Sequence, residues 1–565
     1  MRRFVALALA LALAPVFAVL PSIVHAQSRD VRADSVVARV DRVFAKWDHV
    51  NSPGCAVGVS QDGKLVYQRG YGMSNLEHAI AITPQSIFHV ASISKQFTAF
   101  AILLLEQDGK LSVTDDVRKY VPELPSYGHP ITIDHLLHHT SGLRDQWSLL
   151  GLADWRDDDL ITEADVMRVV TRQKALNFEP GEEYLYSNTG FTLLAVIVKR
   201  VSGQSLRAFA DERIFKPLGM THTHFHDDHT MIVPGRTQAY GPRPGGDWKI
   251  SIPVFDTYGA TSLFTTVGDL LRWEQNFGDA TVGGGPLIAR LTTPGALNDG
   301  APITYGRGVV ATSYRGLRTV GHGGADAGYR ADVVRFPDQG LAVAAMCNLA
   351  NINPSSLTRQ VAEVFVGDLM QPAAAVTASN GASTIPRLDS AQAARYTGAY
   401  WNSRTEDVAR VTAKDGRLTI ARGATLPLVA TGPDRFAVEG QPVTVEFVVP
   451  AKGARQMRVL PEGQRPQLFE AAEALAPGAA PVAPFAGRYG ADEIDTRVEL
   501  RVRGDSLFAQ SRRGTEFALE RLSPDLFQAD FGTLRFVRDA KGSPIAFLVS
   551  TGRVRRLRFD RLGAR

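Results

Sequence analysis

The stretch Phe88-His-Val-Ala-Ser-Ile-Ser-Lys-Gln-Phe-Thr98 places Ser92 and Lys95 three residues apart at the start of an apolar helix. Residues with this spacing share one helix face, so we expect the Lys95 amine beside the Ser92 hydroxyl. A helix start has free N–H groups and a positive dipole end, which stabilise an alkoxide and disfavour a second positive charge. Lys95 can therefore lose its proton and act as a base toward Ser92. In the alternative interpretation, Ser92 only caps the helix and Lys95 lies on the surface.

A second motif, Tyr186-Ser187-Asn188, stands directly before another apolar helix, residues 191–201. A Tyr186 hydroxyl near Lys95 could carry a proton to a leaving group, and the Asn188 amide could hold a substrate carbonyl. Taken alone, such a tyrosine is more often a core aromatic with a hydrogen-bonded hydroxyl.

The third motif is His322-Gly323-Gly324-Ala325, which leads into strand candidates at 329–336 and 341–348. Two glycines let a substrate backbone approach a strand closely. A backbone N–H there could pair with that of Ser92 to bind an oxyanion. The alternative is a glycine-rich turn with a surface histidine.

Together, the motifs resemble the penicillin-recognising serine hydrolases: class C β-lactamases, D-alanyl-D-alanine carboxypeptidases, D-aminopeptidases and related esterases. The resemblance covers about residues 28–370. It implies an α+β fold of the β-lactamase/transpeptidase type, with an antiparallel sheet flanked by helices, for a catalytic domain at 27–370. Further phrases typical of the family are Asp108-Gly-Lys-Leu111, His139-Thr-Ser-Gly-Leu143, Pro217-Leu-Gly-Met220 and Tyr305-Gly-Arg-Gly308.

The resemblance also implies roles for single residues and requires no metal or other cofactor. The implied catalytic residues are Ser92 as the acylated nucleophile, Lys95 as its base and Tyr186 for proton transfer. The implied substrate-binding residues are Asn188, His322, Gly323 and Gly324, and the N–H groups of Ser92 and Ala325 would form the oxyanion hole. His322 replaces the lysine of the family's K-T-G motif. A neutral or partly charged His weakens contact with a substrate carboxylate near pH 7. The resemblance implies a peptidase or esterase, because family members with His at this place are more often of these kinds.

Several functions remain open at this point. The leading one is hydrolysis of an amide or ester in a small-molecule or peptide substrate, by a D-amino-acid peptidase or a small-ester esterase. A penicillin-binding receptor that is acylated without efficient turnover is the alternative. A pure binding module would require the three motifs to be accidental. The sequence does not give the oligomeric state.

The first 26 residues are typical of a signal peptide. Arg2 and Arg3 precede the apolar run 4–20, and Val24-His25-Ala26 is a small-x-small cleavage site. The alternative is an uncleaved membrane anchor. We expect cleavage, no stable membrane span afterwards, and export to a bacterial periplasm or the medium. The net charge of +4 over 565 residues is too small to indicate a nucleic-acid partner.

The C-terminal third is predicted to be two copies of one small all-β barrel module. Tyr396-Thr-Gly-Ala-Tyr400 matches Phe485-Ala-Gly-Arg-Tyr489, and later pairs keep nearly the same offset. Closure into barrels would remove exposed strand edges. The expected modules span 387–470 and 485–565, after linkers at 371–386 and 471–484. The linkers predict modules that fold apart from the catalytic domain.

Only two cysteines, Cys55 and Cys347, are present, which excludes a disulfide-dense scaffold and a Cys-rich zinc site. In the fold that the resemblance implies, their strands are antiparallel neighbours, so a disulfide is one alternative. Two reduced buried thiols are the default expectation.

Three other clusters invite a functional interpretation, and for each we expect a plainer role. In Thr221-His-Thr-His-Phe-His-Asp-Asp-His229, alternate imidazoles on a strand could converge on a metal, but solvated loop histidines are expected. His135 and His139 lack the Glu of a zinc-protease motif. The run Arg553-Val-Arg-Arg-Leu-Arg558 is expected to be a solvated strand face, with contact to an anionic polymer as the alternative.

Overall fold

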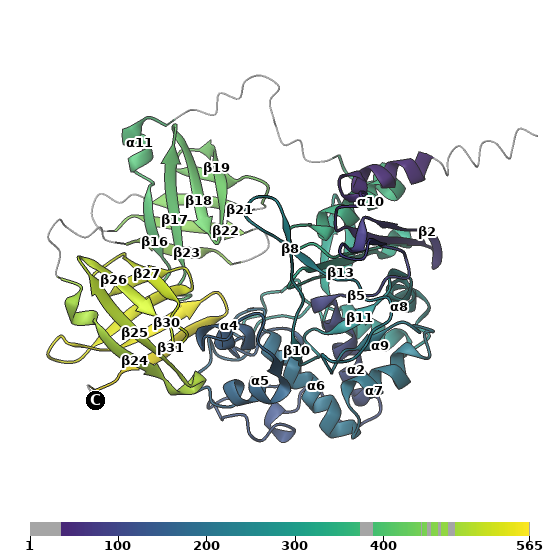
Figure 1. Ribbon diagram of the computed structural model, residues 1–565, viewed down its shortest axis with the longest axis horizontal. Helices are drawn as coiled ribbons and strands as arrows, with labels where there is room; N and C mark the ends of the chain where they lie inside the picture. The colour runs from purple at the N-terminus through teal and green to yellow at the C-terminus, as the bar shows by residue number, and fades with distance from the viewer. Residues whose placement is uncertain are drawn as a thin grey trace, which may run out of the picture.

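The computed structural model describes residues 35–372, 388–441, 443–448, 454–461, 465–472 and 481–563. The predicted signal peptide, most of the first linker and much of the second lie outside the described residues. The described chain forms an N-terminal domain of mixed helices and strands, followed by two β-barrels (Figure 1).

The N-terminal domain is built on a six-stranded antiparallel sheet with the order β12-β13-β14-β15-β1-β2. The hairpin of β1 and β2 turns at Asp62 and Gly63, which both have positive φ, as a tight hairpin turn requires. The strands are β1 (Cys55–Gln61), β2 (Lys64–Tyr71), β12 (Val310–Tyr314), β13 (Leu317–Asp326), β14 (Tyr329–Phe336) and β15 (Leu341–Cys347).

Helices cover both faces of this sheet. Helix α8 (Val267–Asp279) packs against β1 and β15 on one face. Helix α10 (Pro354–Val366) and the helix at 35–44 share a hydrophobic cluster with the other face. Every residue of β15 is therefore buried, although alternate side chains point to opposite faces. The predicted antiparallel sheet flanked by helices is confirmed.

A helical lobe stands beside the sheet and centres on α2 (Ser94–Gln107) and α6 (Asn188–Ser202), which pack together. Helix α6 ends at Gly203, whose left-handed conformation suits glycine. Other helices are α3 (Ile133–Leu137), α4 (Gln146–Leu152), α5 (Glu163–Val170), α7 (Leu206–Ala210) and α9 (Gly284–Thr292). Short strands are β5 (Phe88–His89), β7 (His224–Phe225) and β11 (Leu263–Thr265).

The two C-terminal modules are closed eight-stranded barrels, as the repeat predicted. Equivalent tyrosines fix the same corner in each, since the Tyr400 hydroxyl donates to the Tyr396 carbonyl and the Tyr489 hydroxyl to the Phe485 carbonyl. The first barrel comprises β16 (Gly398–Trp401), β17 (Val408–Lys414), β18 (Arg417–Arg422), β19 (Ala424–Gly432), β20 (Arg435–Val438), β21 (Val443–Val448), β22 (Gln456–Pro461) and β23 (Gln467–Ala471). The second comprises β24 (Gly487–Ala491), β25 (Thr496–Arg503), β26 (Ser506–Gln510), β27 (Glu516–Arg521), β28 (Leu526–Ala529), β29 (Gly532–Arg538), β30 (Pro544–Thr551) and β31 (Val554–Arg561).

The prediction that the modules fold apart is wrong for the second barrel, which lies beside α4 (Figure 1). Its core is continuous with that of the N-terminal domain. Arg144 and Glu493 form a buried ion pair across the boundary, with 3.0 Å between Nη1 and Oε2. The Arg144 guanidinium also donates to the carbonyls of Arg555 and Arg556. A linker-like sequence at 471–484 therefore does not exclude extensive packing of the second barrel on the N-terminal domain.

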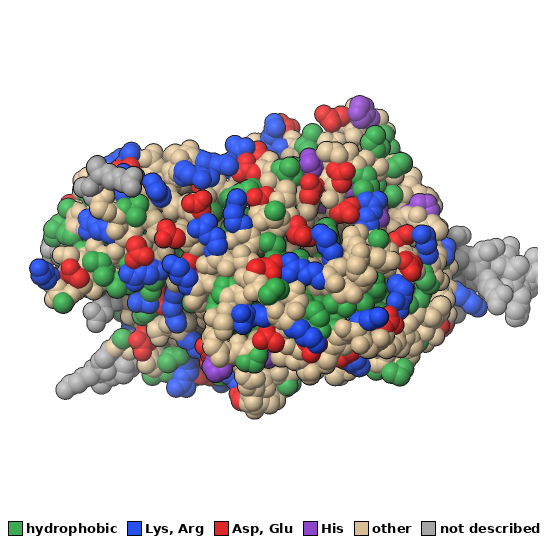
Figure 2. Space-filling view, turned by 90° about the horizontal axis from the view of Figure 1, so that it is seen from below, with side chains coloured by type: hydrophobic (Ala, Val, Ile, Leu, Met, Phe, Trp, Pro, Cys, Tyr) green, Lys and Arg blue, Asp and Glu red, His purple; other side chains and the backbone are tan. Residues whose placement is uncertain are grey.

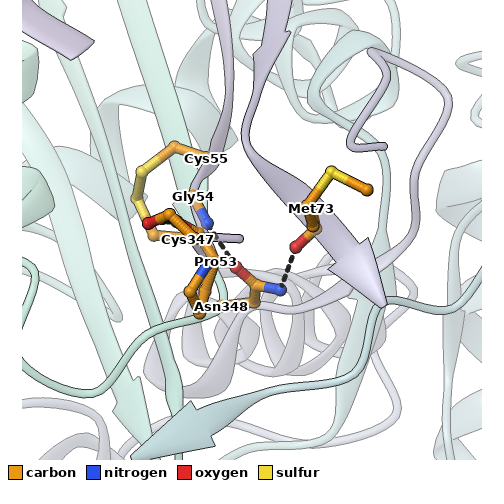
Figure 3. The surroundings of a disulfide bond; sticks show 7 residues. Pro53, Gly54, Cys55, Met73, Cys347 and Asn348 are labelled. Atoms are coloured by element: carbon orange, nitrogen blue, oxygen red, sulfur yellow. Dashed lines mark hydrogen bonds between the residues drawn. A yellow bond between two sulfur atoms is a disulfide. The ribbon is translucent and has the colours of Figure 1, made fainter. Parts of the chain in front are cut away.

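Cys55 and Cys347 are directly opposed on β1 and β15 and form a disulfide, so the expectation of reduced thiols is wrong (Figure 3). The Asn348 side chain lies beside the bond, accepting from the Gly54 N–H at 2.8 Å and donating to the Met73 carbonyl at 3.0 Å. The register of the two strands, which sequence alone leaves open, decided the pairing.

Acidic and basic side chains intermix over the face of the molecule shown in Figure 2. That face carries no extended surface of one sign among the described residues. Within the same ranges, no helix has the length and apolar character needed to cross a bilayer.

Candidate active site

A cleft of about 860 Å³ opens where the sheet, the helical lobe and the second barrel meet. All three sequence motifs contribute to its wall. Its lining includes Ser92, Tyr186, Asn188, His322, Gly323, Gly324, Ala325, Asp326 and Arg553. The structure therefore brings together the predicted site residues, with Lys95 directly behind Ser92.

Ser92 lies in a 3₁₀ turn, Ala91–Ile93, that leads directly into α2. Ala91 has a positive φ of 47°, a conformation that a non-glycine residue seldom adopts and that marks strain at this turn. The turn leaves Ser92 partly exposed while Ala91 and Ile93 are buried. The hydroxyl is thereby presented to the cleft from a rigid element.

Lys95 is fully buried, and its Nζ contacts three oxygens: Ser92 Oγ at 3.1 Å, Asn188 Oδ1 at 2.9 Å and the Ala260 carbonyl at 2.6 Å. Burial lowers the pKa of Lys95 well below its ordinary value, and Asp145 opposes this shift only in part. A neutral amine has two N–H donors and one lone pair. Because Asn188 and Ala260 present only acceptors, they take the two donors and leave the lone pair directed at Ser92.

Tyr186 lies beside this pair, with its ring centroid 4.8 Å from Lys95 Nζ. Its hydroxyl oxygen is buried and has no hydrogen-bond partner among the described residues. Burial raises the pKa of Tyr186 well above its usual value, and the neighbouring Ser92 hydroxyl offsets this only in part. The phenol is therefore neutral and free to exchange a proton with a group bound in the cleft.

The Asn188 side chain lines the cleft and bridges Lys95 and Asp145, and its contact with substrate stays a prediction. Its Oδ1 accepts from Lys95, and its Nδ2 donates to Asp145 Oδ2 at 2.8 Å. The Asn188 backbone N–H donates to the same Asp145 oxygen at 2.7 Å. Because the Asp145 carboxylate only accepts hydrogen bonds, the Nδ2 atom must face it, and this fixes the amide orientation. One Nδ2 hydrogen remains for a ligand.

Asp145 and His139 are structural supports that the sequence analysis missed. Asp145 caps α4 through the N–H groups of Trp147 and Ser148. The Nδ1 of the buried His139 accepts from the Ser187 N–H, and its ring packs on Tyr186 with centroids 4.2 Å apart. The Asp before a helix was a readable capping signal, whereas nothing in the sequence linked it to Asn188.

The two glycines of the third motif differ in whether the surrounding structure would accept a side chain. A Cβ on Gly324 would overlap the Val90 carbonyl, so this glycine lets β13 pass close to the turn that carries Ser92. The backbone that approaches Gly324 closely is therefore the protein's own, at Val90, and not that of a substrate. A Cβ on Gly323 would meet only ordinary contacts. Ala325 follows on the cleft wall, in the strand β13 that contacts the turn carrying Ser92.

His322 is engaged on both ring nitrogens. Its Nδ1 lies 2.5 Å from the Gly323 carbonyl and must carry the proton, so Nε2 accepts from the Tyr305 hydroxyl at 2.9 Å. Burial lowers the pKa of His322 to about 4, which makes the imidazole neutral near pH 7. His322 therefore offers no positive charge to a substrate carboxylate.

Arg553 enters the cleft from the turn between β30 and β31 of the second barrel. Its guanidinium lies 4.9 Å from the Tyr186 ring centroid, and its Nη1 lies 3.9 Å from Asp145 Oδ2. The expectation of a solvated arginine face is wrong for Arg555 alone, because Arg553, Arg556 and Arg558 are exposed. Arg555 is buried against Glu183, and Arg556 pairs with Glu406 of the first barrel.

The histidine-rich segment lies outside the cleft. His224 and His226 face each other with 3.4 Å between Nε2 and Nδ1, and His229 pairs with Asp256. Among the described residues, one group has ligand atoms close enough to hold a metal: Asp228, His229 and Asp256, at the surface. None of these residues lines the cleft.

A family model described as Beta-lactamase matches residues 40–368, more than half of the chain and all three motifs. The chain belongs to this family. It is a serine hydrolase of the β-lactamase fold, which confirms the resemblance drawn from the motifs.

Two relatives align over more residues than the matched domain contains, and a third aligns over a shorter stretch. A D-aminopeptidase of Gluconobacter oxydans is 28% identical over 480 residues, covering 84% of this chain and 87% of its own. Penicillin-binding protein 4* of Bacillus subtilis is 28% identical over 424 residues, covering 72% and 92%. A D-aminopeptidase of Brucella anthropi is 31% identical over 306 residues, covering 53% and 57%.

Solved structures support the fold. An octameric penicillin-binding protein homologue from Pyrococcus abyssi has a TM-score of 0.54 at 22% identity and covers 78% of this chain and 99% of its own. A D-amino acid amidase from Ochrobactrum anthropi has a TM-score of 0.51 at 21% identity, covering 59% and 99%.

His322→Lys is expected to shift the family site toward carboxylate-bearing β-lactams. A fixed ammonium replaces a neutral imidazole, so acylation by a penicillin should rise about tenfold relative to hydrolysis of a neutral p-nitrophenyl ester. Stopped-flow acylation and steady-state ester assays measure the ratio. Tyr305→Phe is the matched control, since it removes the Nε2 partner of His322 without adding a charge. An unchanged ratio in His322→Lys would refute the electrostatic explanation.

Proposed function

We propose that this chain hydrolyses amide or ester bonds of D-amino-acid substrates through an acyl-enzyme on Ser92. The observation that carries the proposal is the buried Lys95 amine, held by two carbonyl oxygens with its third contact on Ser92 Oγ. Its lowered pKa makes the neutral, basic form accessible near pH 7.

In the acylation step, Lys95 takes the Ser92 proton as Oγ attacks the substrate carbonyl. The N–H groups of Ser92 and Ala325 are proposed to stabilise the negative charge that develops on the carbonyl oxygen. Tyr186, with its unpartnered hydroxyl, passes a proton to the leaving amine or alkoxide and recovers it from Lys95. The bond to the leaving group then breaks and the acyl group stays on Ser92.

In the second step, water replaces the leaving group. Lys95 and Tyr186 take a proton from the water that attacks the acyl carbonyl and pass it to Ser92 Oγ as the acyl–oxygen bond breaks, which releases the carboxylic acid and restores the serine hydroxyl. The presence of two proton-transfer groups, Lys95 and Tyr186, supports an enzyme that turns over and not a receptor that remains acylated. Because Penicillin-binding protein 4* is among the relatives, covalent trapping of Ser92 by penicillins is a side reaction worth measuring.

The D-amino-acid preference is supported by the named relatives. The Gluconobacter D-aminopeptidase aligns over most of both chains. The neutral His322 agrees with a substrate that lacks a carboxylate next to the scissile bond. A small-ester esterase is the second candidate, because the same neutral cleft accepts uncharged esters.

We further propose that the enzyme works outside the cytoplasm, after export by the predicted signal peptide at 1–26. The disulfide between Cys55 and Cys347 supports this placement, because such bonds persist in oxidising compartments.

The proposed specificity predicts a strong stereochemical preference. The kcat/KM for D-alanine p-nitroanilide should exceed that for the L-isomer by at least about 100-fold, since a fixed oxyanion site and cleft wall admit one arrangement around Cα. Steady-state release of p-nitroaniline measures both values. Equal rates would remove the D-amino-acid assignment, and p-nitrophenyl acetate hydrolysis without anilide cleavage would favour the esterase.

A further inference from the structure

Asp326 is a carboxylate in the cleft wall that the proposed chemistry does not use. It ends β13, one residue beyond Ala325. Alternate residues of a strand share a face, so His322, Gly324 and Asp326 lie in one row. Gly324 passes under the backbone just before Ser92. The nucleophile is therefore flanked along the strand by a neutral imidazole on one side and a carboxylate on the other.

The Asp326 carboxylate is held in place by Thr261, whose hydroxyl donates to Oδ2 at 3.0 Å. His89 Nε2 lies 3.1 Å from the same hydroxyl and accepts from the Ser262 N–H at 3.0 Å. Burial lowers the pKa of His89 to about 3, so its imidazole is neutral and Nε2 is already satisfied. The single Thr261 proton is thus available to Asp326 and fixes its orientation.

Lys95 and Arg330 are the positive groups that act on Asp326, and neither forms an ion pair with it among the described residues. Arg330 on β14 donates hydrogen bonds to the carbonyls of Ala327 and Tyr329. Lys95 on α2 is directed at Ser92 and has a lowered pKa. Burial raises the pKa of Asp326 to about 6, so above that pH the cleft wall carries a negative charge without a partner.

We propose that Asp326 binds the α-ammonium group of the substrate and so selects D-amino-acid derivatives with a free amino terminus. The inference rests on the proposed function and names the end of the substrate that the site recognises. In such a substrate the ammonium nitrogen is two bonds from the scissile carbonyl carbon. With the carbonyl oxygen at the Ala325 N–H, the next residue along β13 is within reach of that nitrogen. An N-acylated substrate has no charge to offer there.

Asp326→Asn tests the proposal with two substrates that differ only in that charge. For D-alanine p-nitroanilide, kcat/KM should fall about 10- to 100-fold, mainly through KM. For N-acetyl-D-alanine p-nitroanilide it should stay within about threefold, because no charged contact is lost. Asp157→Asn is the matched control: Asp157 also lines the cleft but is exposed at its rim, and both substrates should be unaffected. Equal losses on both substrates in Asp326→Asn, or no loss, overturn the inference.

The pH dependence of the wild-type enzyme gives a second test that needs no variant. The preference for the free amine should rise with pH through about 6, as Asp326 becomes charged, and fall above about 8 as the substrate amine loses its proton. A flat preference overturns the inference and leaves the Ser92 mechanism intact. Failure to cleave either anilide, with p-nitrophenyl acetate still hydrolysed, overturns the proposed function and the inference with it.

Discussion

Ser92→Ala is expected to lower kcat/KM for D-alanine p-nitroanilide and for p-nitrophenyl esters by at least about a thousandfold. The variant removes the atom that carries the acyl group in the proposed mechanism, and the rest of the site alone should give little hydrolysis. The fold should be unaffected, because Ser92 is partly exposed and its Oγ contacts the Lys95 amine at the cleft wall. Circular dichroism and thermal unfolding check that point.

The neighbouring Ser94 provides the matched control within the same motif. Its Oγ donates to the Ala91 carbonyl and accepts from the Leu263 N–H, so it fixes the turn and faces away from the cleft. Ser94→Ala should cost about 1–3 kcal/mol of stability by leaving a buried N–H unpaired. It should keep at least about a tenth of the activity. More than about a hundredth of wild-type activity in Ser92→Ala would mean that the nucleophile is wrongly assigned.

Glu493→Ala is expected to destabilise the protein by about 3–5 kcal/mol, because it leaves the buried Arg144 guanidinium without its counter-charge. The Lys174 N–H also loses its acceptor. Activity should fall as well, since the same boundary holds the Arg553 carbonyl against the Asp145 N–H at 3.2 Å. Denaturant unfolding and steady-state kinetics measure the two effects.

Glu516→Ala is the control for that boundary. Its pair with Arg503 lies within the second barrel and is exposed, so removing it should cost less than about 1 kcal/mol. If both variants lose the same small amount, the second barrel does not depend on the buried pair and contributes little to the active-site geometry.

Much of the fold was predictable because its signals are local. Periodic apolar residues and the Asp62–Gly63 turn identified the helices and the first hairpin, and the repeated Tyr400 and Tyr489 identified the two barrels. The pairing of Ser92 with Lys95 followed from helix spacing alone. These features depend on neighbours within a few residues, which a sequence displays directly.

The remaining features depend on contacts between distant segments. Arg553 reaches the cleft only because the second barrel docks on α4, and no local pattern separates it from a solvated arginine. The hydrogen bond between Asn188 and Asp145 joins residues 43 positions apart, and no local pattern indicates it. The state of Cys55 and Cys347 depended on strand register. Burial also set the charge of His322, which its residue type leaves undetermined.

The central claim is that Ser92 becomes covalently acylated, and intact-protein mass spectrometry with peptide mapping tests it most directly. The wild-type enzyme is treated with a fluorophosphonate, and separately quenched during turnover of a D-alanine ester. We predict one added group per chain in each case, located on Ser92, with the acyl adduct decaying as substrate is exhausted. An unmodified chain, or an adduct on Ser94 or any other residue, would contradict the account.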